Sequence, residues 1–319
     1  MPRINTSADL ENFRKSIVSD RDPNKHCITL CSGSACHATG SLKVAAAIEE
    51  ELENHGLKSA VDFRRTGCHG FCEQGPIVVV YPEGICYLKV KPEDICEIVS
   101  HTLKEKKIVD RLLYIDPNTG EKTTYESDIP FYKNQERLIL GLNRKIDPKS
   151  FEDYLAVGGY QALAKVFFDM TPEQVISEIK KTHLRGRGGA GFPAGIKWDA
   201  ARNAPGDVKY VIVNCDEGDP GAYMDRSLME GNPFAVLEGL LIGAYAIGAH
   251  EGYVYVRQEY PLAVDNLTIA ISQAEEFGLL GKNILGSGFD FIVKVHRGAG
   301  AFVCGEETSL LMSLEGKAG

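Results

Sequence analysis

The chain has 319 residues, 44% of them hydrophobic, which is enough for two domains with separate cores. A formal net charge of −9 argues against nucleic acid or an anionic membrane surface as a main partner. No apolar run approaches the length of a membrane span, and the first residues lack the hydrophobic region of a secretory signal. We therefore expect a cytoplasmic protein without direct membrane insertion, although peripheral attachment to a membrane complex stays open.

Nine cysteines in such a chain indicate metal or redox chemistry rather than a disulfide framework. Four of them form two spaced pairs, Cys31-x4-Cys36 and Cys68-x3-Cys72. We interpret the other five as small buried hydrophobic residues: Cys27, Cys86, Cys96, Cys215 and Cys304.

The segment around these pairs predicts a small thioredoxin-like sheet over residues 26–103, after a polar helix or lead-in over residues 1–25. The expected elements are strand 27–30, a helix capped by Ser41, strand 60–64, a hairpin of 77–81 and 85–90, and a closing helix from Pro92. Both cysteine pairs then fall in loops that follow strands. Four thiolates suit a [2Fe-2S] cluster or a structural zinc ion. The spacing favours the cluster, because structural zinc pairs are more often C-x2-C, and the absence of C-x-x-C disfavours redox disulfides.

Residues 26–100 resemble the thioredoxin-like [2Fe-2S] ferredoxins, including the 24-kDa-type subunit of NADH dehydrogenase. The resemblance implies a [2Fe-2S] cluster with Cys31, Cys36, Cys68 and Cys72 as its ligands. Residues 104–150 have no catalytic pattern of their own, and we interpret them as a linker and an arm of the next domain.

The second half of the chain is organised around a glycine-rich stretch, residues 185–198. Five glycines stand there among Arg185, Arg187 and Lys197, a composition that favours an anion-binding loop for a phosphate-bearing cofactor. The stretch contains a formal G-x-G-x-x-G, but a helix over 171–184, capped by Thr171, precedes it instead of a strand. It is therefore not a Rossmann fingerprint, and we expect a loop that ends at Trp198.

The remaining segments alternate between helix and strand, which predicts an α/β domain over residues 151–319. Two polar features follow predicted strands: Asn214, Asp216, Glu217 and Asp219, and a second glycine loop with Glu306 and Glu307. An ordinary Asp/Gly/Pro turn and a helix-dipole interaction are the simpler interpretations of these carboxylates. The expected elements are helices 151–160 and 162–167, strand 208–213, helix 232–247, strand 253–257, helix 262–277, strand 289–295 and helix 309–314.

Together, the glycine loops, the cations and the polar strand end indicate a nucleotide or flavin site beside an iron–sulfur domain. Phe192, Trp198 and Phe302 can stack on a heteroaromatic ring. No catalytic triad, zinc-hydrolase pair or Walker A sequence occurs.

Residues 130–319 resemble the FMN- and NADH-binding, 51-kDa-type subunit of complex I. The nearest resemblance is to relatives with a fused ferredoxin domain, the flavin subunits of NAD(P)-linked and electron-bifurcating hydrogenases. The motifs that carry it are Gly186–Trp198, Asn214–Gly221 and Gly298–Thr308. The implied fold is an α/β, non-Rossmann FMN-binding domain after the thioredoxin-like domain, and the implied partners are NAD(P)H and other iron–sulfur, hydrogenase or dehydrogenase subunits.

The resemblance also implies residue roles. Phe192 would stack on the nicotinamide side, Asp219 and Glu307 would contact NADH, and Glu217 or Glu307 would tune the local electrostatics, with Phe302 nearby. Three positions depart from the family pattern: Asp219 replaces Glu, Phe302 replaces Tyr, and Ala200 replaces an aromatic residue. The residues implied to hold FMN are Gly186, Arg187, Gly188, Gly189, Ala190, Gly191, Lys197, Asn214, Asp216, Gly305 and Glu306.

The implied reaction is hydride transfer from NADH to FMN, followed by single-electron relay to iron–sulfur clusters, with no side chain as an obligatory acid or base. Because the family pattern continues past residue 319, we expect a truncated chain that lacks a [4Fe-4S] cluster and part of the flavin site. The alternatives are a non-catalytic [2Fe-2S] electron-transfer scaffold without flavin and a zinc-bound structural subunit. The choice between NAD and NADP stays open, as do the electron acceptor, the parent complex, the oligomeric state and whether flavin binds to this truncated chain.

Overall fold

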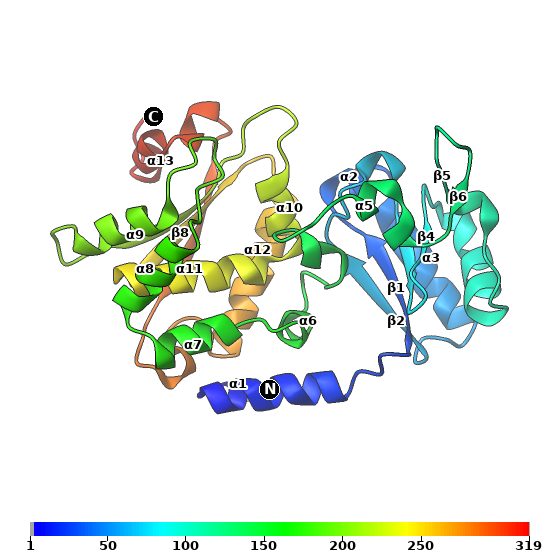
Figure 1. Ribbon diagram of the computed structural model, residues 1–319, viewed down its shortest axis with the longest axis horizontal. Coiled ribbons are helices and arrows are strands. Elements are labelled where there is room, and N and C mark those ends of the chain that lie inside the picture. Colours follow the sequence, from blue (N-terminus) through cyan, green and yellow to red (C-terminus); the bar gives the residue numbers. More distant parts are fainter. Residues whose placement is uncertain (1–2, 319) are drawn as a thin grey trace. The chain divides into compact units, whose positions relative to one another are not determined.

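The computed structural model describes residues 3–318, which divide by their contacts into two units. The N-terminal unit comprises residues 19–150 and 230–232, and the C-terminal unit comprises residues 3–18, 151–229 and 233–318. Figure 1 labels the elements of both. None of the helices in the described residues combines the length and hydropathy that crossing a bilayer requires.

The N-terminal unit follows the predicted order of strands and helices. Its elements are β1 (His26–Cys31), α2 (Ser34–Ala38), α3 (Ser41–Asn54), β2 (Val61–Thr66), β3 (Val78–Tyr81), β4 (Ile85–Tyr87), α4 (Ile95–Glu97), β5 (Tyr114–Ile115), β6 (Lys122–Thr123) and α5 (Pro130–Lys133). A π-helical turn, Ile98–Lys104, continues α4, and single 3-10 turns lie at Cys72–Gln74, Pro92–Asp94, Asp110–Leu112, Glu126–Asp128 and Gly141–Arg144.

Four strands form one sheet in the order β2-β1-β3-β4. β1 and β2 are parallel and are joined through α3, because parallel neighbours need a crossover connection. β3 pairs antiparallel with both β1 and β4. This arrangement confirms the thioredoxin-like fold predicted from the sequence.

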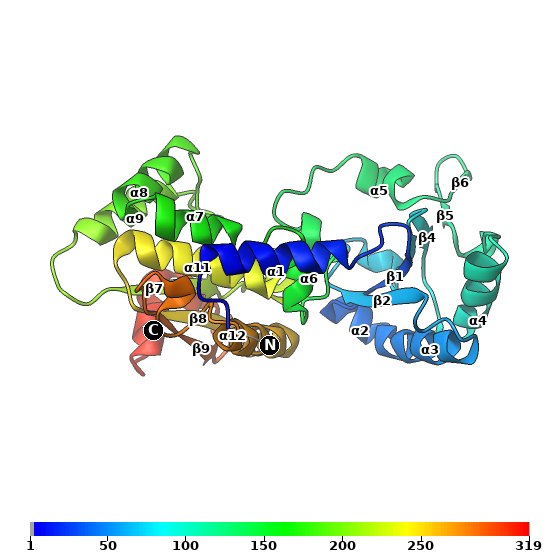
Figure 2. The ribbon, with the colours of Figure 1, turned by 90° about the horizontal axis from the view of Figure 1, so that it is seen from below.

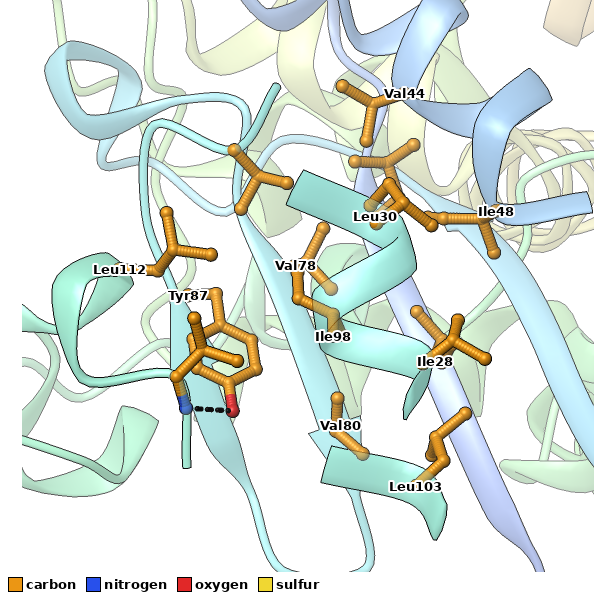
Figure 3. Packing of buried hydrophobic residues seen from close by; sticks show 14 of the residues in the cluster. Ile28, Leu30, Val44, Ile48, Val78, Val80, Tyr87, Ile98, Leu103 and Leu112 are labelled. Carbon is orange, nitrogen blue, oxygen red and sulfur yellow. Dashed lines mark hydrogen bonds between the residues drawn. The ribbon is translucent and has the colours of Figure 1, made fainter. Parts of the chain in front are cut away.

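The central strands of this sheet are buried on both faces. Ile28, Leu30, Val78 and Val80 point into one core with side chains of α3 and the π-helical turn, as Figure 3 shows. The phenol oxygen of Tyr87 closes that core by accepting the backbone N–H of Val109 at 3.2 Å. The opposite face is covered by a second core, which contains Cys31, Cys36, Phe71, Ile77, Val79, Cys86, Leu88, Ile129 and Tyr132.

Two local predictions in this unit need correction. The segment between Cys31 and Cys36 is not wholly a loop, since α2 begins at Ser34. Ser41 does not cap α3; the N-cap is Gly40, with φ of +101°, and Ser41 is the first helical residue. Glycine adopts this positive φ at little cost, whereas serine does not, so the backbone conformation at the N-cap favours Gly40 over Ser41.

Residues 104–150 pack within the N-terminal unit rather than forming an arm of the following domain. Val109, Leu112 and Leu113 join the first core, and Ile129 and Tyr132 join the second. The segment also contains the antiparallel pair β5 and β6.

The C-terminal unit is built on a parallel sheet in the order β7-β8-β9. Its elements are α1 (Ser7–Ser19), α6 (Phe151–Ala156), α7 (Gln161–Asp169), α8 (Pro172–Lys181), α9 (Ala194–Asn203), β7 (Tyr210–Cys215), α10 (Met224–Gly231), α11 (Pro233–Ile247), β8 (Glu251–Arg257), α12 (Pro261–Glu276), β9 (Ile292–Gly298) and α13 (Glu307–Leu314). The alternation of strands and helices confirms the predicted α/β class.

Helix α8 begins as predicted. Thr171 is its N-cap in a capping box with Gln174, and Pro172 occupies the first helical position. The prediction of a loop as far as Trp198 was wrong, because α9 begins at Ala194 and already contains Lys197 and Trp198. The glycine loop therefore connects two helices.

Helix α1, seen in Figure 2, packs on the C-terminal unit. The backbone N–H of Ile4 donates to the carbonyl of Phe277 at 2.9 Å, and the rings of Phe13 and Phe277 stack at 5.8 Å. The first residues of the chain thus fold with its second half.

Candidate cofactor sites

The two cysteine pairs lie at one end of the N-terminal sheet. Cys31 is the last residue of β1 and is in register with Thr66, the last residue of the parallel strand β2. Cys36 follows in α2, and Cys68 and Cys72 lie in the loop after β2, residues 67–75, which we call the cluster loop. Parallel strands end at the same edge of a sheet, so the topology brings the two pairs together.

The four sulfurs form two close pairs, and Cys31 of one pair also contacts Cys68 of the other. The Sγ atoms of Cys31 and Cys36 are 3.2 Å apart, and those of Cys68 and Cys72 are 3.6 Å apart. Within the described chain, no three of these sulfurs lie within 4.8 Å of one another. Four thiolates around a single zinc ion would stand about 3.8 Å apart, given Zn–S bonds of about 2.3 Å. One pair for each iron of a [2Fe-2S] cluster fits this arrangement.

Backbone N–H groups point at two of the sulfurs. The N–H of His69 donates to Cys31 Sγ at 3.5 Å, and the N–H of Gly70 donates to Cys68 Sγ at 3.2 Å. Hydrogen bonds from Cys31, Cys72 and the Gly70 N–H lower the pKa of the Cys68 thiol, which favours its thiolate form. At Gly75 a Cβ would lie 2.7 Å from Cys36 Sγ, so only glycine fits there. The donor set is that of a thiolate-ligated cluster.

The first glycine loop of the C-terminal unit is closed at its base and open at its tip. The N–H of Gly186 donates to the carbonyl of Phe192 at 2.9 Å. Gly189 and Gly191 have φ of +104° and +64°, a conformation that glycine adopts at little cost. Nothing lies within 4 Å of a Cβ placed at Gly188 or Gly189. Space is therefore open where a ligand would approach the backbone.

The three parallel strands end beside the second glycine loop, residues 298–305. Asn214, near the end of β7, donates through Nδ2 to the carbonyl of Gly305 at 2.9 Å. Arg257, which ends β8, pairs with Asp216 at 3.0 Å and donates to the carbonyl of Gly300 at 3.4 Å. The acidic strand end and the second glycine loop thus meet.

A third contact connects this place to the helix that follows the first glycine loop. Lys197 Nζ of α9 lies 2.5 Å from Glu307 Oε2 at the start of α13. Both side chains are more than half exposed. Lys197 thus contacts Glu307 directly, and Asn214 bonds to Gly305, two residues before Glu307, so predicted residues from three separate sequence motifs lie together.

Two predicted site carboxylates also act as helix caps. Glu306 is the N-cap of α13, and the N–H groups of Thr308 and Ser309 donate to it, which lowers its pKa. Glu217 accepts the N–H groups of Asp225 and Arg226, in the first turn of α10, at 3.0 and 3.1 Å. The capping role of Glu306 agrees with the simpler helix-dipole interpretation. Helix α10 itself was not predicted.

Asp216 is the most buried of the predicted site carboxylates, with a side chain 1% exposed. Burial raises its pKa, although the positive charge of Arg257 opposes this. Its Oδ2 atom is buried without a hydrogen-bond partner among the described residues. A buried carboxylate oxygen without a partner is the kind of group that a ligand hydroxyl or N–H would satisfy.

Several of the other predicted residues are exposed. Phe192 and Phe302 are 54% and 65% exposed, which is unusual for aromatic side chains and compatible with stacking on a ligand. The remaining exposed members are Gly186, Arg187, Ala190 and Asp219.

A cavity of about 290 Å³ lies beside β7 and is lined mainly by apolar side chains, including Trp198, Met229 and Leu240. Asn214 is the predicted site residue on its wall. Asp225 also lines it, and burial together with the charge of Glu217 raises the pKa of this carboxyl to about 6.

Arg257 contacts predicted site residues but was not itself predicted from the sequence. Its charge connects Asp216, Glu259 and the second glycine loop. The signal was present, since a cation directly follows the apolar run 253–256 at a strand end where open α/β sheets bind ligands.

Comparisons with known protein families match both units. Residues 16–103 match the family model of the thioredoxin-like [2Fe-2S] ferredoxin, and residues 179–319 match that of the Nuo51 FMN-binding domain. The residues between 103 and 179 lie outside both matches.

Among curated proteins, the chain is 58% identical over 174 residues to the NADP-reducing hydrogenase subunit HndC of Solidesulfovibrio fructosivorans, a match that covers 54% of this chain and 35% of that protein. It is 53% identical to an NADH-quinone oxidoreductase subunit of Rhizobium meliloti, covering 51% of this chain and 39% of that protein. The chain thus spans well under half the length of these two relatives. Among solved structures, the thioredoxin-like [2Fe-2S] ferredoxin from Aquifex aeolicus is 35% identical, with 27% of this chain and 87% of that chain covered and a TM-score of 0.26.

Proposed function

Because the chain joins a thioredoxin-like [2Fe-2S] ferredoxin domain to an FMN-binding domain of the Nuo51 family, we propose that it is the flavin-binding part of an NAD(P)H:acceptor oxidoreductase. It would act in the cytoplasm as one component of a multisubunit complex of the hydrogenase or NADH dehydrogenase type. Its relatives, an NADP-reducing hydrogenase subunit and an NADH-quinone oxidoreductase subunit, support this choice of complexes.

The observation that carries the proposal is the meeting of the second glycine loop with the acidic strand end. Arg257 connects Asp216 to Gly300, and Asn214 bonds to Gly305. The Lys197–Glu307 ion pair connects α9, the helix that follows the first glycine loop, to the start of α13.

The groups in this arrangement suit the parts of FMN. The open backbone around Gly188 and Gly189, with nearby cations, suits a phosphate. The side chains of Asn214 and Asp216 suit ribityl hydroxyls or ring N–H groups. FMN, when bound, would accept a hydride from a nicotinamide nucleotide and release electrons singly, and this chemistry belongs to the cofactor.

In this proposal the protein positions the rings. Phe192 and Phe302 would limit where a nicotinamide can stack, and Glu307, held by Lys197, would contact the nucleotide. Cys31, Cys36, Cys68 and Cys72 would hold a [2Fe-2S] cluster, which supplies single-electron transfer chemistry when bound. No side chain needs to act as an acid or a base.

Anaerobic rapid mixing of the FMN-loaded chain with NADH or NADPH tests the proposal. We expect loss of the flavin absorbance, with one nucleotide preferred. Glu307→Gln should keep FMN bound but change the dependence of the rate on nucleotide concentration, whereas the exposed control Glu315→Gln should match the wild type. Unchanged kinetics in Glu307→Gln would remove that residue from the nucleotide site, and failure of the wild type to bind FMN would contradict the flavin assignment.

A further inference from the structure

A segment outside both family matches encloses the cluster loop. Residues 126–144, which we call the arm clamp, lie between the matched regions 16–103 and 179–319. They belong to the N-terminal unit, and Ile129 and Tyr132 are buried in the same core as Cys31 and Cys36. Residues outside the ferredoxin match therefore form part of the core that surrounds the predicted ligands.

His69 connects the cluster loop to this segment. It is fully buried and directly follows the ligand Cys68. Its backbone N–H donates to Cys31 Sγ at 3.5 Å, and its Nε2 lies 2.8 Å from Thr66 Oγ1. Its Nδ1 lies 3.5 Å from Oε1 of Glu126, a side chain that is 7% exposed. His69 thus lies between the cysteine sulfurs and a carboxylate of the arm clamp.

Glu126 is held in place by two further groups. Arg144 Nη1 lies 3.0 Å from its Oε2, and the hydroxyl of Tyr81 donates to the same oxygen at 3.2 Å. A buried carboxylate is tolerated only with such partners, and removing one of them is costly. The position of Glu126 is therefore well determined.

Arg137 holds the backbone of the same loop. Its Nη1 donates to the carbonyl of His69 at 2.6 Å, and its guanidinium lies 5.0 Å from the centre of the Tyr132 ring. At Gly70, where φ is +89°, a Cβ would lie 3.2 Å from Arg137 Nη2. The next residue, Phe71, stacks on Phe131 at 4.4 Å with an interplanar angle of 7°. Three consecutive residues of the cluster loop are thus in contact with the arm clamp.

We propose that the arm clamp fixes the cluster loop in its ligating conformation, with Arg137 and Glu126 as positioning residues for the [2Fe-2S] site. This inference rests on the proposed function, because it concerns the same cluster. Groups behind the ligands set their orientation and restrict solvent access, and both affect metal retention and redox potential. The negative charge of Glu126 also disfavours addition of an electron to a nearby cluster.

The test uses the full chain with its cluster assembled. The rate of cluster loss to a chelator and the midpoint potential are measured for Arg137→Gln and Glu126→Gln. Their controls are Lys133→Gln and Glu121→Gln, which change exposed residues of the same charge in residues 104–150. Arg137→Gln should release the cluster about tenfold faster, the usual size of an outer-shell effect. Glu126→Gln should raise the midpoint potential, because it removes a negative charge near the cluster. A general loss of stability would not shift the potential consistently upwards.

The two levels of the proposal fail differently. If the wild-type chain assembles a cluster but both clamp variants match their controls in release rate and potential, the arm clamp proposal is wrong and the ferredoxin assignment stands. If the wild-type chain assembles no [2Fe-2S] cluster, the proposed function itself is contradicted. If Glu126→Gln fails to fold, the test rests on Arg137→Gln, which keeps the buried carboxylate. Faster cluster release in this variant than in Lys133→Gln supports the proposal, and equal release contradicts it.

Discussion

Gly188 and Gly195 belong to the same glycine-rich stretch but have different surroundings. A Cβ at Gly188 meets nothing within 4 Å, whereas a Cβ at Gly195 would lie 2.8 Å from the backbone nitrogen of Lys180 in α8. The first glycine is compatible with a ligand-facing role, and the second is required for the close packing of α8 against α9.

We therefore expect opposite results from two alanine substitutions. Gly188→Ala should leave the thermal unfolding midpoint nearly unchanged and weaken FMN binding, measured by quenching of flavin fluorescence. Gly195→Ala should lower the free energy of unfolding by about 1–3 kcal/mol, because backbone atoms must move apart. Equal stability losses in both variants would refute this division of roles.

Asp225 provides a prediction about pH. Its folded pKa of about 6 lies above the unfolded value of about 3.9. Between these pH values the folded state keeps a proton that the unfolded state has released, so this residue makes the protein less stable as the pH rises towards 6 and above. Asp225→Asn, which cannot ionise, should therefore raise the unfolding temperature at about pH 7.5 and much less at about pH 4.5. An equal gain at both pH values would show that burial does not perturb this carboxyl.

At the scale of elements, the sequence predicted most strands and helices, because their apolar spacing and caps are local signals. Thr171 and Pro172 marked the start of α8 correctly. The start of α9 at Ala194 was missed, because glycine and proline dominate the preceding residues and the proline at its N-cap gives no side-chain signal.

Helix α10 was missed for a different reason. The segment Met224–Gly231 follows an Asp/Gly/Pro turn, and its N-terminus is capped by Glu217, which lies well before it in the chain. A cap contributed from a distant position cannot be recognised from local sequence. The same fact explains why the capping role of Glu217 was not predicted.

Substitution of Glu217 separates its two possible roles. Glu217→Ala removes both acceptors at the start of α10 and should cost about 1 kcal/mol of stability in a denaturant titration. Glu217→Gln keeps one carbonyl acceptor and should lose less. If Glu217→Ala instead weakens FMN binding with no change in stability, the residue serves the cofactor site and not the helix.

At the scale of the whole molecule, the sequence predicted two folded parts and the type of each. It did not predict that residues 104–150 pack with the first part, or that residues 3–18 pack with the second. Both assignments depend on contacts between residues far apart in the chain, such as Phe13 with Phe277, and apolar spacing does not specify a partner.

The site residues show the same limit. The spacing of the pairs Cys31/Cys36 and Cys68/Cys72 marked them as candidate metal ligands, because metal ligation restricts both residue type and spacing, and the family resemblance implied the [2Fe-2S] cluster. It missed Arg257 and Glu126, whose partners are set by strand order and by packing of the arm clamp.

The visible absorption spectrum of the chain, measured with its iron, sulfide and flavin content after anaerobic reconstitution, tests the central claim most directly. We predict overlapping flavin and [2Fe-2S] bands, with two irons per chain and flavin bands that bleach on addition of NADH or NADPH. Cys68→Ser should lose the cluster bands alone. Cys96→Ser should keep them, since Cys96 is exposed rather than buried as the sequence predicted. Cluster bands without flavin would reduce the chain to an electron carrier, and a colourless chain that holds zinc would contradict the account altogether.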